Sequence, residues 1–259
     1  GTQMVGSITV TEEDTLGAPV QVFTGAWGAT VTCAFDPNDK QVSPAGYGDA
    51  GAVDIATEHV EYTIRFQNTG NAPATNVMLT DLFDPGLGLA SLEVLGYSHT
   101  PTAMLIGPDG ELVVRFDGIQ LPDSGANFTG SQGFFRFGID LLPGQPHGTL
   151  ITNTASIFFD NNPPVITNTT HTTLVDCDLW EPTIVSSGWE ALMATAGDSY
   201  QWYLDGLPVA GATEQLFFLT TNGSYTVEVT SEFGCVLLSD PFQLTTVSIE
   251  EQHELGIAV

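Results

Sequence analysis

The chain has 259 residues, 42% of them hydrophobic and 15 of them phenylalanine, so it can bury a core and is not disordered throughout. Its charge is extreme, because 31 acidic residues face only four Lys and Arg, which gives a formal net charge of −27. Nucleic acids and anionic membranes bind dense basic surfaces, so this composition argues against both as partners. No apolar run approaches the roughly 20 residues that span a bilayer, so membrane insertion is not expected either.

Residues 1–34 contain a few β-like runs, notably 7–11 and 29–33. These runs are too few to bury a core by themselves. We therefore expect this segment to be either the end of an upstream domain or a strand-exchange segment that pairs with another subunit.

The most regular pattern begins at Val60, where apolar and polar residues alternate strictly up to Phe66. A period of two with aromatic and β-branched residues predicts a strand that is buried on one face. The following segment, NTGNAPATN, supplies turn residues, and a second strand is predicted at 77–82. The two strands are interpreted as a hairpin at the centre of an all-β domain.

Further strands of the same kind recur up to residue 174, separated by turn signals such as PDG and PGQP. Seven short strands separated by such turns predict a β-sandwich. The predicted strands are 60–68, 77–82, 92–97, 111–116, 134–140, 150–159 and 164–174.

Three motifs within residues 35–175 carry a resemblance to a known family: FDPNDKQVSPAG, YTIRFQNTGNAPATNVMLTDLFDPGLGL and NTASIFFDNNPPVITNT. They resemble the conserved-repeat β-sandwich domain of long bacterial surface proteins, in the variant exported by the type IX (gliding-associated) system of Bacteroidetes. The resemblance implies a domain at 35–175 that acts as a spacer, stalk or assembly module. It also implies the type IX export machinery as a partner and the cell surface or the extracellular space as the location.

Residues 176–247 predict a smaller second domain, in which Trp202 lies on a strand that ends at the Asp205–Gly206 turn. This segment resembles the Ig-like or PKD-like modules of the same secreted proteins, where the strand Trp packs in the core. Cys177 and Cys235 fall within the segment and are expected to form a disulfide. Because Cys235 lies ten residues after Tyr225, this bridge would join the ends of the domain instead of crossing its centre.

Residues 248–259 resemble the linker that precedes a type IX C-terminal sorting domain. The sequence thus predicts two β-sandwich, Ig-like domains in series with extra N-terminal strands. The third cysteine, Cys33, is either a buried thiol or a bridge between chains.

Two oxygen-rich loops bracket the main domain and are the candidate metal site. Ca²⁺ takes six to eight oxygen ligands, which closely spaced Asp and Asn residues supply. The alternative is that these side chains shape turns by binding their own backbone. The candidate ligands are Asp36, Asn38, Asp39 and Asp160.

Lys40 is the only lysine in the chain. One interpretation is an ion pair with Asp36 or Asp39. The other is a covalent crosslink to Asn161 or Asn168, of the kind that some bacterial adhesins form.

No HExxH or GxSxG motif and no Cys/His cluster occurs in the sequence. The favoured function is therefore non-catalytic: an extracellular or cell-surface structural or adhesive component, such as a subunit of a filament, stalk or appendage. Its expected partners are copies of itself or other surface-protein subunits. The alternative is an accessory carbohydrate- or protein-binding module of a large secreted enzyme, with Trp27, Trp180 or Trp189 as candidates for stacking on sugars.

Overall fold

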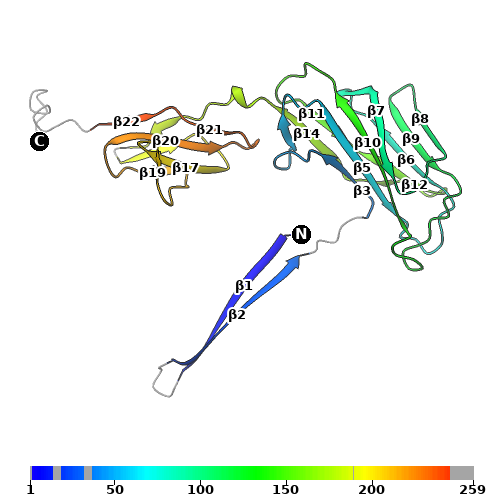
Figure 1. Cartoon of the computed structure of the whole chain (residues 1–259), viewed down its shortest axis with the longest axis horizontal. Coiled ribbons are helices and arrows are strands. Elements are labelled where there is room, and N and C mark those ends of the chain that lie inside the picture. Colours follow the sequence, from blue (N-terminus) through cyan, green and yellow to red (C-terminus); the bar gives the residue numbers. More distant parts are fainter. Residues whose placement is uncertain (1, 14–18, 32–36, 189, 246–259) are drawn as a thin grey trace, which may run out of the picture. The chain divides into compact units, whose positions relative to one another are not determined.

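The computed structural model describes residues 2–13, 19–31, 37–188 and 190–245. It divides into two compact units, Gly1–Pro37 and Asn38–Val259. The elements are almost entirely β-strands, which confirms the predicted fold class (Figure 1). In the described residues, no helix is long and apolar enough to cross a membrane.

The first unit is a β-hairpin. Strand β1 (Thr2–Glu13) pairs antiparallel with β2 (Pro19–Val31), with Thr2 opposite Val31 and Glu12 opposite Gln21. Both strands are longer than the runs predicted at 7–11 and 29–33. Cys33 lies outside the described residues.

The main sandwich is built from two larger sheets and a smaller one. The first sheet has the order β3 (Asp39–Ser43), β5 (His59–Gln67), β10 (Gln132–Leu141), β7 (Leu87–Tyr97). The second has the order β13 (Val165–Ile166), β12 (Ala155–Phe159), β6 (Val77–Leu82), β9 (Glu111–Phe116), β8 (Ala103–Ile106). The smaller sheet consists of β11 (Leu150–Asn153), β14 (Thr170–Val175) and β4 (Ala52–Asp54), with β4 parallel to β14.

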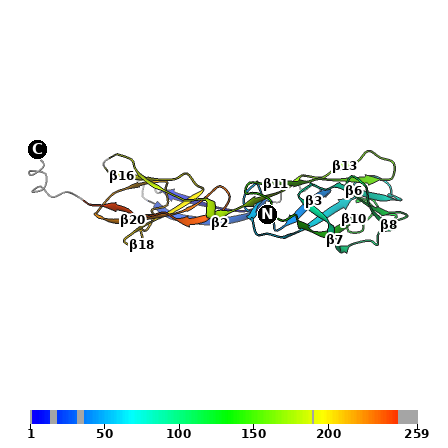
Figure 2. The same ribbon diagram turned by 90° about the horizontal axis from the view of Figure 1, so that it is seen from above.

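The two larger sheets pack face to face over one apolar core, and Figure 2 shows β6 and β13 in one layer above β7 and β10. The inward residues of β5 are fully buried, as their alternation predicts. Phe66 of the first sheet meets Phe116 of the second with their ring centroids 5.6 Å apart. Aromatic contacts of this kind fix the spacing between the layers.

The predicted hairpin between β5 and β6 is wrong, because the two strands belong to different sheets. β5 pairs with β3 and β10, whereas β6 pairs with β9 and β12. The connecting segment is too long for a tight hairpin turn, and the Asn68 amide donates to the backbone oxygens of Ala72 and Leu121. The segment therefore carries the chain across the core, so that the apolar faces of β5 and β6 both contribute to it.

The second domain has two small sheets. The first has the order β15 (Ile184–Ser186), β16 (Ala191–Ala194), β19 (Leu216–Phe218). The second has the order β18 (Leu207–Pro208), β17 (Ser199–Leu204), β20 (Gly223–Thr230), β21 (Val236–Leu238), with β22 (Phe242–Leu244) also pairing with β20. Trp202 is fully buried at the centre of this domain, as predicted, and stacks on Phe217 at 5.2 Å.

Candidate functional site

Three polar residues occupy inward positions on strands that otherwise bury apolar side chains. Lys40 shares the inward face of β3 with Val42, and Asp81 follows Val77 and Leu79 on the inward face of β6. Asn153 is the last residue of β11. The side chains of a strand alternate, so each of these three groups is directed into the core of the sandwich.

Lys40 reaches across the core from the first sheet to the second. Its ammonium nitrogen forms an ion pair with Asp81, and both side chains are almost completely buried. The nitrogen also lies over two aromatic rings, 4.9 Å from the centroid of Tyr62 and 5.7 Å from that of Phe137. A buried charge pair is tolerated only with this kind of enclosure and mutual compensation.

Asn153 lies next to this ion pair, and Lys40, Asp81 and Asn153 together form the buried cluster. Ala155 lies directly opposite Asp81 in the β12–β6 ladder, and Asn153 precedes Ala155 by two residues. The ladder ends at this pair, so Asn153 lies just beyond it, and its amide acts on the pKa of Asp81. Asn153 is 2% exposed, yet neither atom of its amide has a hydrogen-bond partner, and the same holds for Oδ1 of Asp81 and for the buried hydroxyl of Thr172.

The pKa values show how strongly the site excludes water. Burial lowers the pKa of Lys40 to about 8, although Asp81 opposes the shift. Burial raises the pKa of Asp81, against the effects of Lys40 and of the Asn153 amide. Burial also raises the pKa of Tyr62, and Asn153 again acts in the opposite direction. The Asn153 amide is thus within interaction range of both groups, although no hydrogen bond of normal geometry joins it to either.

These shifts move the pair toward its uncharged forms, an amine and a carboxylic acid. The cluster therefore brings together a potential nucleophile, a proton donor and an amide carbonyl in a dry core.

The sequence suggests either an ion pair of Lys40 with a nearby aspartate or a crosslink to an asparagine. The ion pair with Asp39 is wrong, because Arg65 takes both carboxylate oxygens of Asp39, from Nε at 2.5 Å and from Nη2 at 2.7 Å. Asp36 lies outside the described residues. Asn168 does contact Lys40, but through the backbone: its Oδ1 accepts from the Lys40 N–H and its Nδ2 donates to the Lys40 oxygen, both at 2.9 Å.

The candidate calcium ligands serve other contacts in the structure. Asn38 Oδ1 accepts the Gln67 N–H at 3.0 Å, and Asp39 binds Arg65. Asp160 accepts the N–H groups of Thr75 and Asn76, at 3.2 and 2.8 Å. Across the described ranges, no group of three or more His, Cys, Asp and Glu side chains is placed to hold a metal ion.

Calcium binding stays a prediction, and the melting temperature tests it. A bound ion stabilises the folded state by mass action, so calcium at these loops predicts a lower melting temperature in excess EDTA. Added Ca²⁺ should then restore the original value, and Mg²⁺ at the same concentration should not. An identical melt with and without EDTA would remove the calcium prediction.

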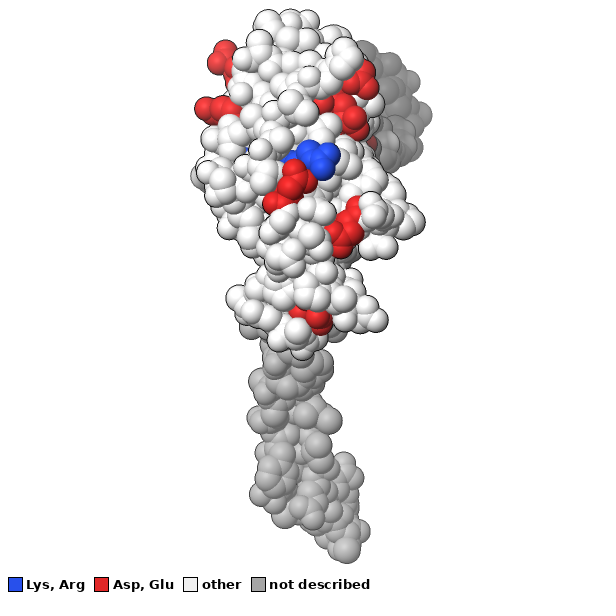
Figure 3. Space-filling model, turned by 90° about the vertical axis from the view of Figure 1, so that its right-hand side faces the viewer, with Lys and Arg blue, Asp and Glu red and all other residues white. Residues whose placement is uncertain are grey.

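All four Lys and Arg side chains of the protein are paired with a carboxylate. Besides the two pairs above, Arg115 binds Asp117 at 2.9 Å and Arg136 binds Glu61. The remaining acidic groups therefore set the surface charge, and Figure 3 shows them scattered over one face with one basic group beside an acidic one. A surface of this kind keeps a protein soluble and repels polyanions.

The second domain packs against the sandwich next to its own disulfide. Cys177 and Cys235 are bonded, with their Cα atoms 5.5 Å apart. Cys235 packs in a small apolar cluster with Ala52 and Val175 of the sandwich, against which Trp180 also lies. The Tyr47 hydroxyl donates to the Asp198 carboxylate at 3.1 Å, which adds a polar contact between the domains.

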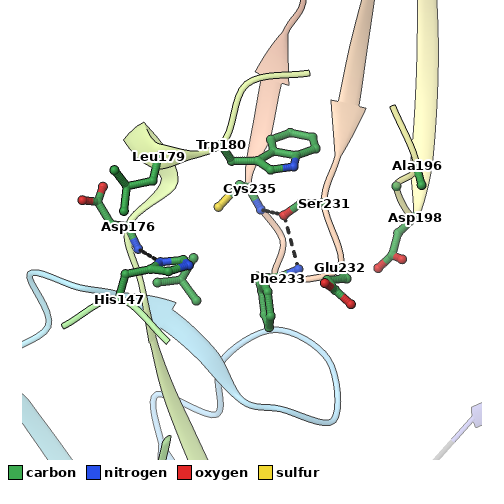
Figure 4. Close-up of a pocket in the computed structure, with 12 residues that line it drawn as sticks. His147, Asp176, Leu179, Trp180, Ala196, Asp198, Ser231, Glu232, Phe233 and Cys235 are labelled. Carbon is green, nitrogen blue, oxygen red and sulfur yellow. Dashed lines mark hydrogen bonds between the residues drawn. The ribbon is translucent and has the colours of Figure 1, made fainter. Parts of the chain in front are cut away.

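A cavity of about 410 Å³ lies at this junction. Figure 4 shows His147 and Asp176 on one side of it and Asp198 and Glu232 on the other. His147 accepts the Asp176 N–H through Nδ1 at 3.0 Å. Ser231 Oγ accepts the N–H groups of Phe233 and Cys235, at 3.3 and 3.1 Å. These hydrogen bonds hold the backbone on both sides of the junction.

The sequence interpretation missed Asp81 and Asn153, although a signal for both was present. In VMLTDL the inward positions are Val77, Leu79 and Asp81, and in LITNTASIF they are Ile151, Asn153, Ala155 and Ile157. A polar residue in phase with a buried apolar series is the signature of a buried polar group.

Comparison with solved structures finds β-rich surface proteins at low similarity. The chain matches the major pilin subunit BcpA of Bacillus cereus, in its D312A form, at 15% identity with a TM-score of 0.37, covering 95% of this chain and 75% of that one. It matches the collagen-binding domain of a Staphylococcus aureus adhesin at 11% identity with a TM-score of 0.33, covering 56% of this chain and all of that one.

No curated protein matches the sequence. A family model does, over residues 36–173, which is just over half of the chain; its description is "Domain of unknown function (DUF7619)". The chain therefore belongs to the DUF7619 family.

Proposed function

We propose that this protein is a non-catalytic structural or adhesive component of the extracellular surface, in which two β-sandwich domains act as one joined unit. The junction between the domains carries the proposal. A shared apolar cluster, which includes the disulfide-bonded Cys235, and the Tyr47–Asp198 hydrogen bond both bridge it. A spacer or stalk needs such a fixed joint, whereas independent modules are usually connected by a flexible linker.

The disulfide and the surface charge support a location outside the cytoplasm. Structural disulfides persist in oxidising compartments and are rare in the reducing cytosol. The excess of acidic groups, with all four Lys and Arg side chains already paired, favours solubility at an exposed surface.

An edge strand of the sandwich supports association with other subunits, either copies of this chain or different surface proteins. Among the described strands, β8 pairs with β9 alone, and its residues Met104, Leu105 and Ile106 are 45%, 62% and 44% exposed. An apolar strand edge with free backbone groups is suited to strand addition. Export by the type IX system is part of the proposal and is supported by the resemblance of the three sequence motifs.

Immunogold labelling of intact source cells with antibodies against this chain tests the proposal. We expect label on or beyond the cell envelope, and loss of that label in a strain that lacks the type IX translocon. Label only after lysis would contradict a surface role, and unchanged label in the export mutant would contradict the route alone. If the labelled polypeptide also contains a hydrolase domain, the alternative function as an accessory binding module is favoured.

A further inference from the structure

We propose that Lys40 and Asn153 form an intramolecular amide bond between Nζ and Cγ, with Asp81 as the proton-transfer group, so that a covalent bond links the two sheets of the sandwich. This inference rests on the buried cluster and does not depend on where the protein acts. None of the three residues belongs to the junction between the domains.

The choice of Asn153 follows from its lack of partners. A buried amide ordinarily makes hydrogen bonds through both of its atoms, and leaving both unpaired is costly. Asn153 is buried without partners next to an ion pair, whereas the amide of Asn168 is engaged at both atoms by the Lys40 backbone. Asn161 is exposed. Among Asn153, Asn161 and Asn168, only Asn153 is buried with both amide atoms unpaired.

The position of the lysine suits it for attack. Its side chain crosses the core with Nζ over the rings of Tyr62 and Phe137, so few orientations are open to Nζ. Fixing two reacting groups in this way replaces an encounter in solution with a local step. The enclosure also keeps water, the competing nucleophile, away from the carbonyl.

The reaction balances without any further reagent. The ammonium of Lys40 passes a proton to Asp81, and the resulting amine attacks Cγ of Asn153 while Asp81 donates a hydrogen bond or a proton to the carbonyl oxygen. Collapse of the tetrahedral intermediate breaks the bond between Cγ and Nδ2, and the nitrogen leaves as ammonia after taking a proton relayed by Asp81. One amine and one primary amide thus give one secondary amide and NH₃, with no change of oxidation state.

The test is the intact mass of the full chain after reduction, followed by mapping of chymotryptic peptides. We expect a mass about 17 Da below the sequence value, from the loss of one ammonia, and a branched peptide that joins Lys40 to Asn153. Lys40→Met, Asn153→Ala and Asp81→Ala should each have the full sequence mass. Asn168→Ala is the matched control, and it should keep the deficit.

Three results would overturn the proposal. The first is a folded wild-type chain at the full sequence mass. The second is a deficit of about 18 Da with a branched peptide joining Lys40 to Asp81, which would show loss of water and a different bond. The third is a 17 Da deficit that persists in Lys40→Met, because a succinimide at Asn222–Gly223 also loses ammonia. Peptide mapping of the wild-type chain decides between these results even if a variant fails to fold.

Discussion

In a chain that already carries Asn153→Ala, replacing Asp81 with alanine is expected to lower the free energy of unfolding of the sandwich by about 3–5 kcal/mol. The Asn153→Ala background leaves Lys40 and Asp81 as an ion pair, so the effect of the charge is measured without any crosslink. Both side chains are buried, so removing the carboxylate leaves the amine of Lys40 buried next to aromatic rings without an ion-pair partner. A loss of this size is a large part of the 5–15 kcal/mol that stabilises most domains.

The matched control replaces both partners with apolar residues, as Lys40→Met with Asp81→Leu in the same background. This double variant should recover most of the loss, because it leaves no buried charge without a partner. Urea unfolding followed by far-UV circular dichroism measures the stability. The described part of the sandwich contains no Trp, so tryptophan emission reports separately on the other parts of the chain. A loss below about 1 kcal/mol for Asp81→Ala would show that water reaches Lys40.

The pH dependence of Asp81→Ala gives a second check. Burial lowers the pKa of Lys40 from 10.5 to about 8 in the folded chain, and removing Asp81 lowers it further, because Asp81 raises it. Between the folded and unfolded pKa values the unfolded state binds more protons, so stability rises with pH. Below about pH 8 only the Asp81→Ala variant gains from this effect, because Lys40 of its parent is still protonated. The deficit of Asp81→Ala should therefore shrink as the pH is raised toward about 8 and stay level above it, where both proteins gain stability in parallel.

Replacing Trp202 with alanine is expected to unfold the second domain while the sandwich remains folded. Trp202 is fully buried, stacks on Phe217, and donates from Nε1 to the backbone oxygen of Glu214 at 2.8 Å. Truncating a buried Trp costs about 3–5 kcal/mol. A domain of this size rarely has more than about 3–5 kcal/mol to lose, so most of its stability would be gone.

Phe218→Ala is the control for this variant. Phe218 follows Phe217 on β19 but is 67% exposed, so its truncation should change stability by less than about 0.5 kcal/mol. Limited proteolysis with chymotrypsin separates the domains, because the second domain contains no Lys or Arg for trypsin to cut. We expect Trp202→Ala to leave a resistant sandwich fragment and Phe218→Ala to resemble the wild type. Equal resistance of the two variants would contradict the assignment of Trp202 to the core.

The sequence predicted the strands well where alternation was strict and poorly where burial was incomplete. The strands at 77–82 and 111–116 have the predicted bounds, because both alternate cleanly between core and solvent. The predicted strand 150–159 is interrupted at Thr154, and 164–174 is interrupted between β13 and β14. Strands β3, β4 and β8 were not predicted, since each is short and carries polar, small or exposed residues.

Pairing between strands could not be predicted from local pattern. The connection after β5 has turn residues that suit a hairpin, yet β5 and β6 lie in facing sheets because each buries its apolar face against the other. For the same reason the sequence suggests Asp36 and Asp39, which are near neighbours in the chain, as ion-pair partners of Lys40. The carboxylate that pairs with it, Asp81, lies on the opposite sheet and is brought close only by the tertiary fold.

The disulfide has a consequence for how the protein would respond to tension. A pull along the backbone from residue 176 to residue 245 passes from Cys177 to Cys235 through their sulfur atoms, so residues 178–234 lie in a loop that bears none of it. Most strands of the second domain, including β17 and β20, are inside that loop. While the bond is intact the domain cannot lengthen by unravelling this segment, and reduction would convert a nearly inextensible joint into a long extensible one.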